Sequence, residues 1–269
     1  MRRDGSGRVA LVTGASAGIG RAFADVLAER GYDLILTARR ADRLNALARD
    51  LAARHGIAAQ VIVSDLASRD AVTQIVDAVR ALGLQVDVLV NNAGYGVPGG
   101  YRTTAWAQQE AFLQVLVVAL AELTHRCLPG MVERRWGRII NVASVAGLLP
   151  GVAGHTLYAA SKAFVIRFSE SLAKEVRADG VHVTALCPGM TLSEFHDVTG
   201  TRAQVSRLPA FMWLDAPAVA RQGYDAVMRG DEVYINGRVY RALVLAARLL
   251  PQGLVHALMR RNSGKFRKI

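Results

Sequence analysis

Cysteines and long hydrophobic runs are scarce in this sequence. Two of its 269 residues are cysteines, Cys127 and Cys187, and neither belongs to a CxxC or Cys/His cluster. We therefore expect two reduced thiols in a cytoplasmic protein and no metal site. No run reaches the roughly 18 uninterrupted apolar residues that a spanning helix needs. The polar, basic residues 1–7 are followed by no hydrophobic signal region, so we expect no secretory signal.

Acidic residues are missing from the C-terminal segment. Residues 238–269 contain eight Lys or Arg and no Asp or Glu, whereas residues 1–237 contain 25 basic and 22 acidic residues. The net charge of +11 therefore resides mainly in the tail. The sequence has no RNA-binding, zinc-finger or helix-turn-helix signature, and we expect no nucleic-acid partner.

Strand-like and helix-like segments alternate along the rest of the chain. Each β-branched or aliphatic run of strand length is followed by apolar residues at helical spacing. The expected strands cover residues 8–13, 33–38, 58–64, 86–90, 138–143, 181–187 and 232–235, and the longest expected helix covers residues 104–133. Strands that alternate with helices indicate βαβ units and a parallel sheet within one α/β domain.

A glycine-rich turn joins the first expected strand to the first expected helix. It reads Thr13-Gly-Ala-Ser-Ala-Gly-Ile-Gly20. Glycines let the backbone approach a pyrophosphate closely, and the amides at a helix N-terminus attract its negative charge. Tight turns also need glycine for steric reasons, but the flanking strand and helix favour a dinucleotide site. The residues expected to form it here are Gly14, Ser16, Gly18, Ile19 and Gly20.

The second expected strand ends at Arg39 and Arg40, about 20 residues past the glycine turn. An acidic residue here would bind the ribose hydroxyls of NAD, whereas arginine accommodates the 2′-phosphate of NADP. Because no Asp or Glu ends this strand, the sequence favours NADP over NAD. We expect Arg39 to bind the phosphate; the alternative is that Arg39 and Arg40 simply cap a surface loop, an interpretation that fits Arg40 better than Arg39. The third strand ends at Asp65, whose carboxylate is expected to accept a hydrogen bond from the adenine amino group.

Tyr158 and Lys162 lie four residues apart at the start of an apolar helical run. On a helix they lie one above the other on one face. A neighbouring ammonium stabilises a phenolate, which lowers the tyrosine pKa from about 10 and suits the phenol to proton exchange with a carbonyl oxygen. The same spacing also arises by chance on half-solvated helix faces, so the pair alone does not establish a site.

Six motifs in a fixed order give the chain a family resemblance. They are Thr13-Gly-x-x-x-Gly-Ile-Gly20, Asp65-Leu66, Asn91-Asn-Ala-Gly94, Asn141-Val-Ala-Ser144, Tyr158-x-x-x-Lys162 and Pro188-Gly189. Over roughly residues 8–234 the chain resembles the short-chain dehydrogenase/reductase family. The resemblance implies a three-layer, doubly wound Rossmann-type α/β fold with a seven-stranded parallel sheet, and a nicotinamide cofactor across the C-terminal strand ends. The further cofactor-binding residues that it implies are Arg39, Asp65, Leu66, Asn92, Ala93, Gly94, Tyr158, Lys162, Pro188, Gly189 and Thr191.

The resemblance also implies three catalytic roles. Tyr158 would protonate a carbonyl oxygen or deprotonate an alcohol, and Lys162 would bind the nicotinamide ribose and lower the tyrosine pKa. Ser144 would hydrogen-bond the substrate oxygen; it precedes Tyr158 by 14 residues, one more than the commonest spacing in the family. We therefore expect an NADP-dependent oxidoreductase that interconverts a ketone or aldehyde and an alcohol, and that forms a homo-oligomer.

The chain departs from the family at Leu116, where the catalytic asparagine is usually found. In the family that asparagine supports a water that links the lysine to solvent, and leucine offers no polar atom. We expect Ser144, Tyr158 and Lys162 to remain active with a slowed or rerouted proton supply, for example through a water on a main-chain carbonyl. The alternative is an NADP-binding sensor or scaffold protein with weak or no turnover.

Several segments keep more than one interpretation. The apolar segment 192–214 is expected either to contact a lipophilic substrate or to pack as a lid. His155 is expected to be a solvated loop side chain. Residues 238–269 are expected to form a basic helical extension of a catalytic domain that covers residues 1–237. This extension would pack on the domain, form a subunit interface or lie on an anionic membrane surface, and we favour the first two.

Overall fold

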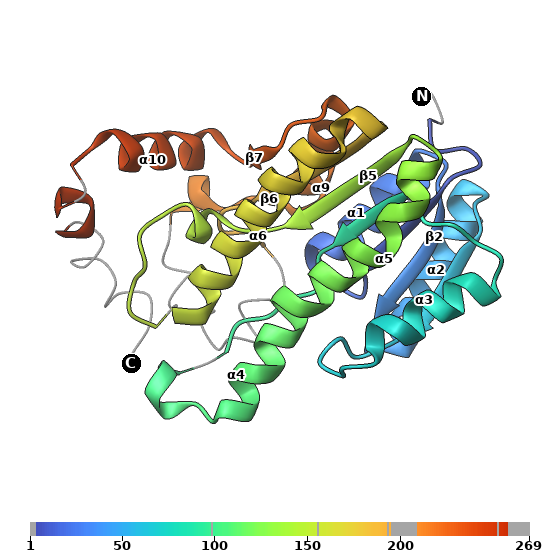
Figure 1. Cartoon of the computed structure of the whole chain (residues 1–269), viewed down its shortest axis with the longest axis horizontal. Coiled ribbons are helices and arrows are strands. Elements are labelled where there is room, and N and C mark those ends of the chain that lie inside the picture. The colour runs from blue at the N-terminus through green and yellow to red at the C-terminus, as the bar shows by residue number, and fades with distance from the viewer. Residues whose placement is uncertain are drawn as a thin grey trace.

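A seven-stranded parallel sheet forms the centre of the molecule (Figure 1). The structure is a computed structural model that describes residues 4–97, 99–154, 156–192, 194, 209–251 and 253–257. In these residues the strand order is β3-β2-β1-β4-β5-β6-β7. The strands are β1 (Val9–Thr13), β2 (Asp33–Ala38), β3 (Ala59–Val63), β4 (Val88–Asn91), β5 (Gly137–Val142), β6 (Val181–Cys187) and β7 (Val233–Ile235). The order reverses between β1 and β4, and the predicted doubly wound fold is confirmed.

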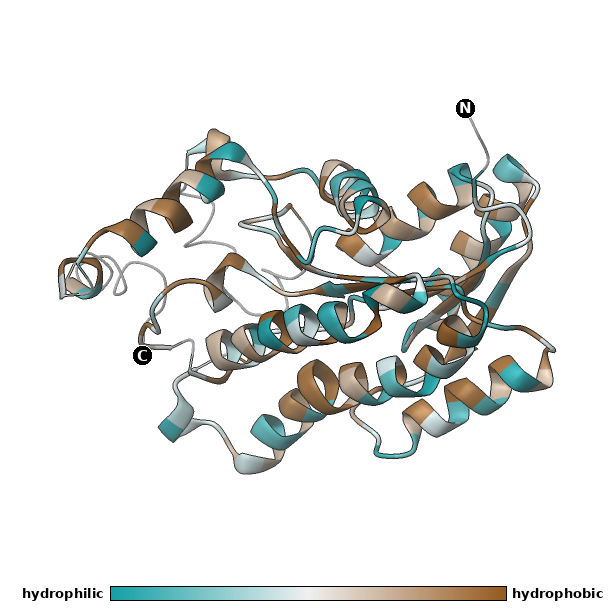
Figure 2. Ribbon diagram, turned by 45° about the horizontal axis from the view of Figure 1, so that its top comes forward, coloured by the Kyte–Doolittle hydropathy of each residue, from teal (hydrophilic) through white to brown (hydrophobic). Residues whose placement is uncertain are grey.

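Helices cover both faces of the sheet and complete the three layers. One face is covered by α1 (Gly18–Glu29), α2 (Ala41–His55) and α9 (Ala216–Arg229), and the other by α3 (Ala71–Ala81), α5 (Ala119–Glu133) and α6 (Thr156–Val176). Strand residues are buried on both sides, so Leu36 packs toward α1 and α2 whereas Ile35 packs toward α3. The apolar residues of strands and helices, brown in Figure 2, meet between the layers. Burial of this apolar surface is the main stabilising contribution.

The helix predicted over residues 104–133 consists of three consecutive pieces. They are α4 (Trp106–Leu113), a π-helical turn (Gln114–Val118) and α5. In the described residues this run, Trp106–Glu133, is the one helix with the length and apolar composition of a membrane span. Phe112 and Leu123 are nevertheless buried against α3 and the sheet. A core helix of a folded domain has the same length and composition.

Helix α10 (Arg238–Leu249) follows β7 and extends beyond the edge of the sheet (Figure 1). It buries Tyr240 and Val244 and exposes Leu245 and Leu249. Residues 258–269, which contain five of the eight basic residues of the tail, lie outside the described residues.

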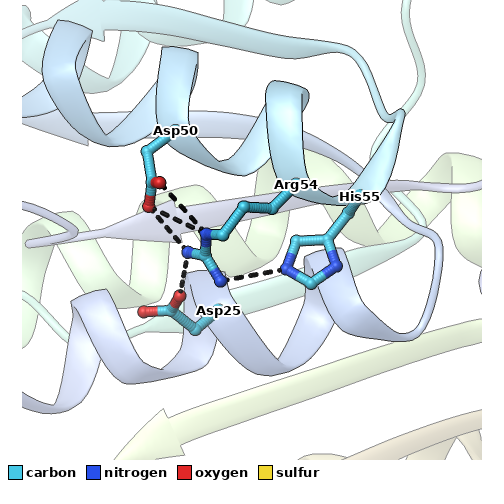
Figure 3. A network of polar contacts seen from close by, with 4 residues as sticks. All are labelled: Asp25, Asp50, Arg54 and His55. Atoms are coloured by element: carbon cyan, nitrogen blue, oxygen red, sulfur yellow. Dashed lines mark hydrogen bonds and ion pairs between the residues drawn. The ribbon is translucent and has the colours of Figure 1, made fainter.

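An arginine at the end of α2 ties α1 and α2 together on the surface (Figure 3). Arg54 donates hydrogen bonds of 2.7 Å to both Asp25 of α1 and Asp50 of α2, and lies 3.2 Å from the His55 ring nitrogen. These groups are largely exposed, and exposed ion pairs contribute little stability. The buried core, rather than this network, therefore fixes α1 and α2 behind the glycine turn.

Candidate active site

A large cavity lies at the carboxyl edge of the sheet, where the ends of parallel strands meet. Its volume is about 640 Å³. The predicted residues that line it are Gly14, Ser16, Gly18, Ile19, Arg39, Asp65, Leu66, Asn92, Ala93, Gly94, Ser144, Tyr158, Lys162, Pro188, Gly189 and Thr191. Of the predicted residues, Gly20 alone does not line the cavity. A Cβ there would overlap the Asn92 amide and the Gly14 carbonyl, so Gly20 serves close packing of α1 against the turn.

The glycine turn is held in shape by the end of β4. Gly14 and Gly18 have φ values of 66° and 54°, a left-handed conformation that favours glycine. The Asn92 side-chain amide donates to the Thr13 carbonyl at 2.9 Å, and the Thr13 hydroxyl accepts from the backbone N–H groups of Asn92 and Ala93, each at 2.9 Å. Asn92 therefore shapes the cofactor turn from behind as well as lining the cavity.

The residues around this turn fit a nicotinamide dinucleotide. Helix α1 begins at Gly18 with no side-chain cap, so its first amides face the cavity edge as an anion site. Thr37 lies near the carboxyl end of β2 and Ser64 directly follows β3, and both line the cavity. Their buried hydroxyl oxygens have no hydrogen-bond partner among the described residues. Buried polar groups are normally satisfied, so these two hydroxyls suit a polar ligand.

Arginines surround the end of β2 as predicted, but in a different arrangement. Arg39 is exposed and lies 4.0 Å from Asp65. Arg40 occupies the N-cap position of α2 and donates to the Ser16 hydroxyl of the glycine turn at 3.0 and 3.2 Å. Arg40 therefore does more than cap a surface loop, because its side chain contacts the cofactor turn.

A carboxylate from the segment after β6 already binds these arginines. Glu194 accepts from Arg40 at 2.8 Å and from Arg43 at 2.6 Å. The two guanidinium groups lower the pKa of the Glu194 carboxyl. Neither Arg43 nor Glu194 was predicted as a site residue. The position of Arg43, four residues after Arg39, could have indicated its role, whereas Glu194 is over 150 residues away from its partners in the sequence.

Ser144, Tyr158 and Lys162 come together on the other side of the cavity. Ser144 follows β5 and accepts from the backbone N–H of Ala146 at 3.1 Å. Tyr158 is half-buried in the first turn of α6 and shares a side-chain hydrogen bond with Ser144. The buried Lys162 lies one turn later and donates to the Val142 carbonyl of β5 at 2.8 Å. Its ammonium is 5.8 Å from the centre of the Tyr158 ring.

Burial dominates the titration of this pair. It raises the pKa of the Tyr158 phenol above its usual value, and the hydrogen bond with Ser144 acts in the opposite direction. Burial also lowers the pKa of Lys162 to about 8. Lys162 was expected to lower the pKa of Tyr158, but desolvation raises this pKa and has the larger effect. The phenol is therefore protonated at neutral pH, as a general acid requires.

A buried polar network lies directly beneath these residues. Asn91 of β4 donates to Asn141 of β5 at 2.9 Å and to Thr124 of α5 at 3.0 Å, and Asn141 donates to Ser169 of α6 at 2.9 Å. All four side chains are buried. Such a network fixes the relative positions of the strands and helices that it joins. It thereby holds α6, and with it Tyr158, against the end of β5.

Leu116 faces the cavity from the π-helical turn, as its alignment with the family predicts. Its side chain is 1% exposed and lines the cavity opposite Gly94. The π-helical turn was not predicted; in it the Ala119 N–H donates to the Gln114 carbonyl, five residues back. π-turns within α-helices occur frequently at functional sites.

The remaining wall of the cavity is apolar and partly built from distant segments. Val152, Met190, Met212 and Leu243 contribute to it. Tyr240 and Leu243 of α10 were not predicted as site residues, because no local motif marks them. His155, Phe195 and most of segment 192–214 lie outside the described residues.

Known proteins are similar to this chain in sequence and in fold. Residues 8–203 match the family model for short chain dehydrogenase. An uncharacterized oxidoreductase of Myxococcus xanthus (strain DK1622) is 35% identical over 254 residues, which cover 94% of this chain and 97% of the relative. The 3-oxoacyl-(acyl-carrier-protein) reductase FabG of Escherichia coli (strain K12) is 36% identical over 244 residues, which cover 87% of this chain and 98% of the relative. The structure of a short-chain dehydrogenase from Sphingobium yanoikuyae in complex with NADPH matches with a TM-score of 0.79 and 30% identity, over 93% of this chain and 95% of that chain. This chain therefore belongs to the short-chain dehydrogenase/reductase family of oxidoreductases, which act on CH–OH groups.

Proposed function

We propose that this protein is an NADP-dependent oxidoreductase that interconverts a ketone or aldehyde and an alcohol. The observation that carries the proposal is the meeting of Ser144, Tyr158 and Lys162 in the cavity that the glycine turn also lines. When bound, NADPH supplies the hydride for the carbonyl carbon. The chain itself supplies orientation of the substrate and the proton for the carbonyl oxygen.

Each of the three residues has a role that its contacts support. The Tyr158 phenol, protonated at neutral pH, donates its proton to the carbonyl oxygen. The Ser144 hydroxyl hydrogen-bonds both this phenol and the substrate oxygen, and so sets the distance for proton transfer. The Lys162 ammonium is anchored by the Val142 carbonyl. Its other N–H groups would be available to the ribose of a bound cofactor, and its charge would stabilise the phenolate that remains after proton transfer.

The preference for NADP over NAD rests on Arg39, Arg40 and Arg43 around Ser16. Glu194 shows that Arg40 and Arg43 bind an anion at this position. Phosphate and carboxylate use the same charge-assisted contacts with guanidinium groups. The 2′-phosphate of a bound NADP would therefore take the place of the Glu194 carboxylate on these arginines. NAD has no such phosphate to compensate for breaking the two ion pairs.

The affinity for NADPH is expected to fall as pH rises through about 8. Lys162 is charged below its pKa of about 8 and loses a donor and its charge above it. We expect the NADPH dissociation constant to increase about tenfold from about pH 7 to about pH 9, which corresponds to one charge-assisted hydrogen bond. Fluorescence titration at each pH measures this. The Lys162→Met variant should bind weakly at every pH; a wild-type pH dependence in that variant would assign the titration to another group.

The Leu116→Asn variant tests whether the leucine limits the proton relay. We expect the added amide, which faces the cavity, to raise kcat for ketone reduction by roughly 3-fold to 10-fold, less than the roughly 10²-fold to 10⁴-fold of general acid–base catalysis, because Tyr158 already donates the proton. The Leu116→Ala variant is the control, because it removes the leucine side chain without adding a polar group. Steady-state kinetics across pH compares the three proteins. Equal kcat profiles for Leu116→Asn and wild type would show that Leu116 does not limit turnover.

The alternative function is an NADP-binding sensor or scaffold protein, and Leu116 is the observation that favours it. Two measurements separate the functions. Binding of NADPH and NADH is titrated first, and oxidation of NADPH is then followed with aldehydes, cyclic ketones and 3-oxoacyl thioesters, the class named for the E. coli relative. The apolar wall formed by Val152, Met190 and Leu243 suits the lipophilic members of this panel. Tight binding of NADPH without oxidation by any substrate would establish the sensor.

We further propose a homo-oligomer with reduced Cys127 and Cys187 that acts in the cytoplasm. The family membership and the two free thiols support this proposal. Residues 238–269 are proposed as an extension of the catalytic domain of residues 1–237, joined to it through Tyr240 and Val244. The comparisons give no support to membrane contact by the tail, and we do not propose it.

A further inference from the structure

Tyr240 of α10 reaches into the active site from the far end of the chain. Its side chain is 5% exposed and lines the same cavity as Tyr158. The ring lies against Gly189 so closely that a Cβ at that position would overlap it. Gly189 is therefore required for packing of Tyr240, in addition to any contact with a cofactor.

The Tyr240 hydroxyl joins two backbone segments, one at Met190 and the other at Met212. It accepts from the Met190 N–H at 3.0 Å and donates to the Met212 carbonyl at 2.6 Å. The same two segments also pair directly, since the Leu214 N–H donates to the Met190 carbonyl at 2.8 Å and the Leu192 N–H donates to the Leu214 carbonyl at 3.0 Å. We call residues 190–192 and 212–214 the loop neck. Tyr240 adds a side-chain bridge to this short parallel pairing.

The start of α10 is built to direct Tyr240 onto the loop neck. Gly237, the N-cap, has a φ of 82°, and a Cβ there would lie 3.0 Å from the Leu214 side chain. Asn236 is fully buried; its N–H donates to the Cys187 carbonyl at 3.3 Å and its side chain donates to Gln222 at 3.0 Å. The turn between β7 and α10 is thus fixed on both sides, and the first turn of α10 can point only toward the Pro188-Gly189 segment.

The loop neck is directly connected to the catalytic residues. Met190, Thr191 and Met212 line the cavity that contains Tyr158. The Val145 N–H, next to Ser144, donates to the Pro188 carbonyl at 3.1 Å. A displacement of the neck therefore changes the wall of the substrate pocket beside the residues proposed to perform the chemistry.

We propose that Tyr240 is a positioning residue that fixes the loop neck and thereby shapes the substrate pocket, which makes α10 part of the active site. The effect on substrate rests on the proposed function, whereas the effect on the neck does not. Without the hydroxyl, the Met190 N–H loses its acceptor and the Met212 carbonyl loses a donor. Loss of these two hydrogen bonds destabilises the closed loop neck and favours its local opening.

The Tyr240→Phe variant removes the hydroxyl and keeps the ring on Gly189. Hydrogen exchange, followed by mass spectrometry, reports on the amides of Leu192 and Leu214, which hydrogen-bond within the neck. We expect them to exchange about tenfold faster in the variant, with no change in the strands β1 and β5. For acetoacetyl-coenzyme A as substrate, we expect KM to rise about tenfold and kcat to stay within about twofold of wild type.

Tyr224→Phe is the matched control. Tyr224 is also buried, and its hydroxyl donates to Asp4 at 2.9 Å and lies 3.2 Å from the Tyr32 hydroxyl, outside the cavity. This variant should leave both neck exchange and KM at the wild-type values. Unchanged neck exchange in Tyr240→Phe, or an equal increase in both variants, would overturn the proposal, as would faster exchange with an unchanged KM. If the wild type reduces no substrate, the proposed function fails, and the exchange data alone decide whether Tyr240 fixes the neck.

Discussion

Replacing Tyr158 with phenylalanine is expected to lower kcat for carbonyl reduction by about 10³-fold while the NADPH dissociation constant stays within a few-fold of wild type. The phenol lines the cavity and shares a hydrogen bond with the Ser144 hydroxyl. Phenylalanine keeps the ring in the same place and removes only the acidic group. Single-turnover oxidation of NADPH measures the chemical step, and fluorescence titration measures cofactor binding.

Two comparisons make the Tyr158→Phe result specific. Tyr224→Phe, which removes a buried hydroxyl outside the cavity, should retain wild-type turnover. Circular dichroism establishes that both variants keep their helices and strands. Wild-type turnover in Tyr158→Phe would eliminate this residue as the acid, and loss of NADPH binding in the variant would show that Tyr158 serves the cofactor instead.

Removing the Arg39 and Arg40 side chains together is expected to abolish the preference for NADP. We expect the NADPH dissociation constant of Arg39→Ala/Arg40→Ala to rise about 100-fold and that of NADH to change by no more than about twofold. Two charge-assisted hydrogen bonds to the 2′-phosphate account for this difference, because NADH carries no phosphate there. Titration of both cofactors with both proteins gives the four constants.

Arg54→Ala is the control for this double variant. Arg54 is also an exposed arginine on α2, but its partners are Asp25 and Asp50 rather than cavity residues (Figure 3). Its removal should affect neither cofactor. Equal weakening of NADPH and NADH by the double variant would mean that the arginines support the fold of the turn, and no weakening at all would place the 2′-phosphate elsewhere.

The sequence was sufficient to predict the sheet and most of the residues along its carboxyl edge. The reason is physical, since each motif directly follows a strand and parallel strands bring their carboxyl ends to one edge. Tyr158 and Lys162 share a helix face by their spacing, and Ser144 follows the neighbouring strand β5. Leu116 was placed at the site by comparison with the family, and it lines the cavity.

Features that depend on contacts between distant segments were not predictable from local patterns. Glu194 reaches Arg40 and Arg43 across more than 150 residues, and Tyr240 reaches Met190 across 50 residues. The π-helical turn around Leu116 differs from an α-helix only in the choice of hydrogen-bond acceptor, which hydrophobic periodicity does not reveal. The raised pKa of Tyr158 follows from its burial, and a helical spacing carries no information on solvent access.

The transfer of deuterium from NADPH deuterated at C4 to the substrate tests the central claim most directly. Each C4 epimer is incubated with the full-length protein and acetoacetyl-coenzyme A, and the product is analysed by mass spectrometry. We expect a 3-hydroxyacyl product with one deuterium on the carbinol carbon from one epimer, at a rate about 10³-fold lower with Tyr158→Phe. Tight NADPH binding without any deuterated alcohol from the whole substrate panel would contradict the account and identify an NADP-binding protein without reductase activity.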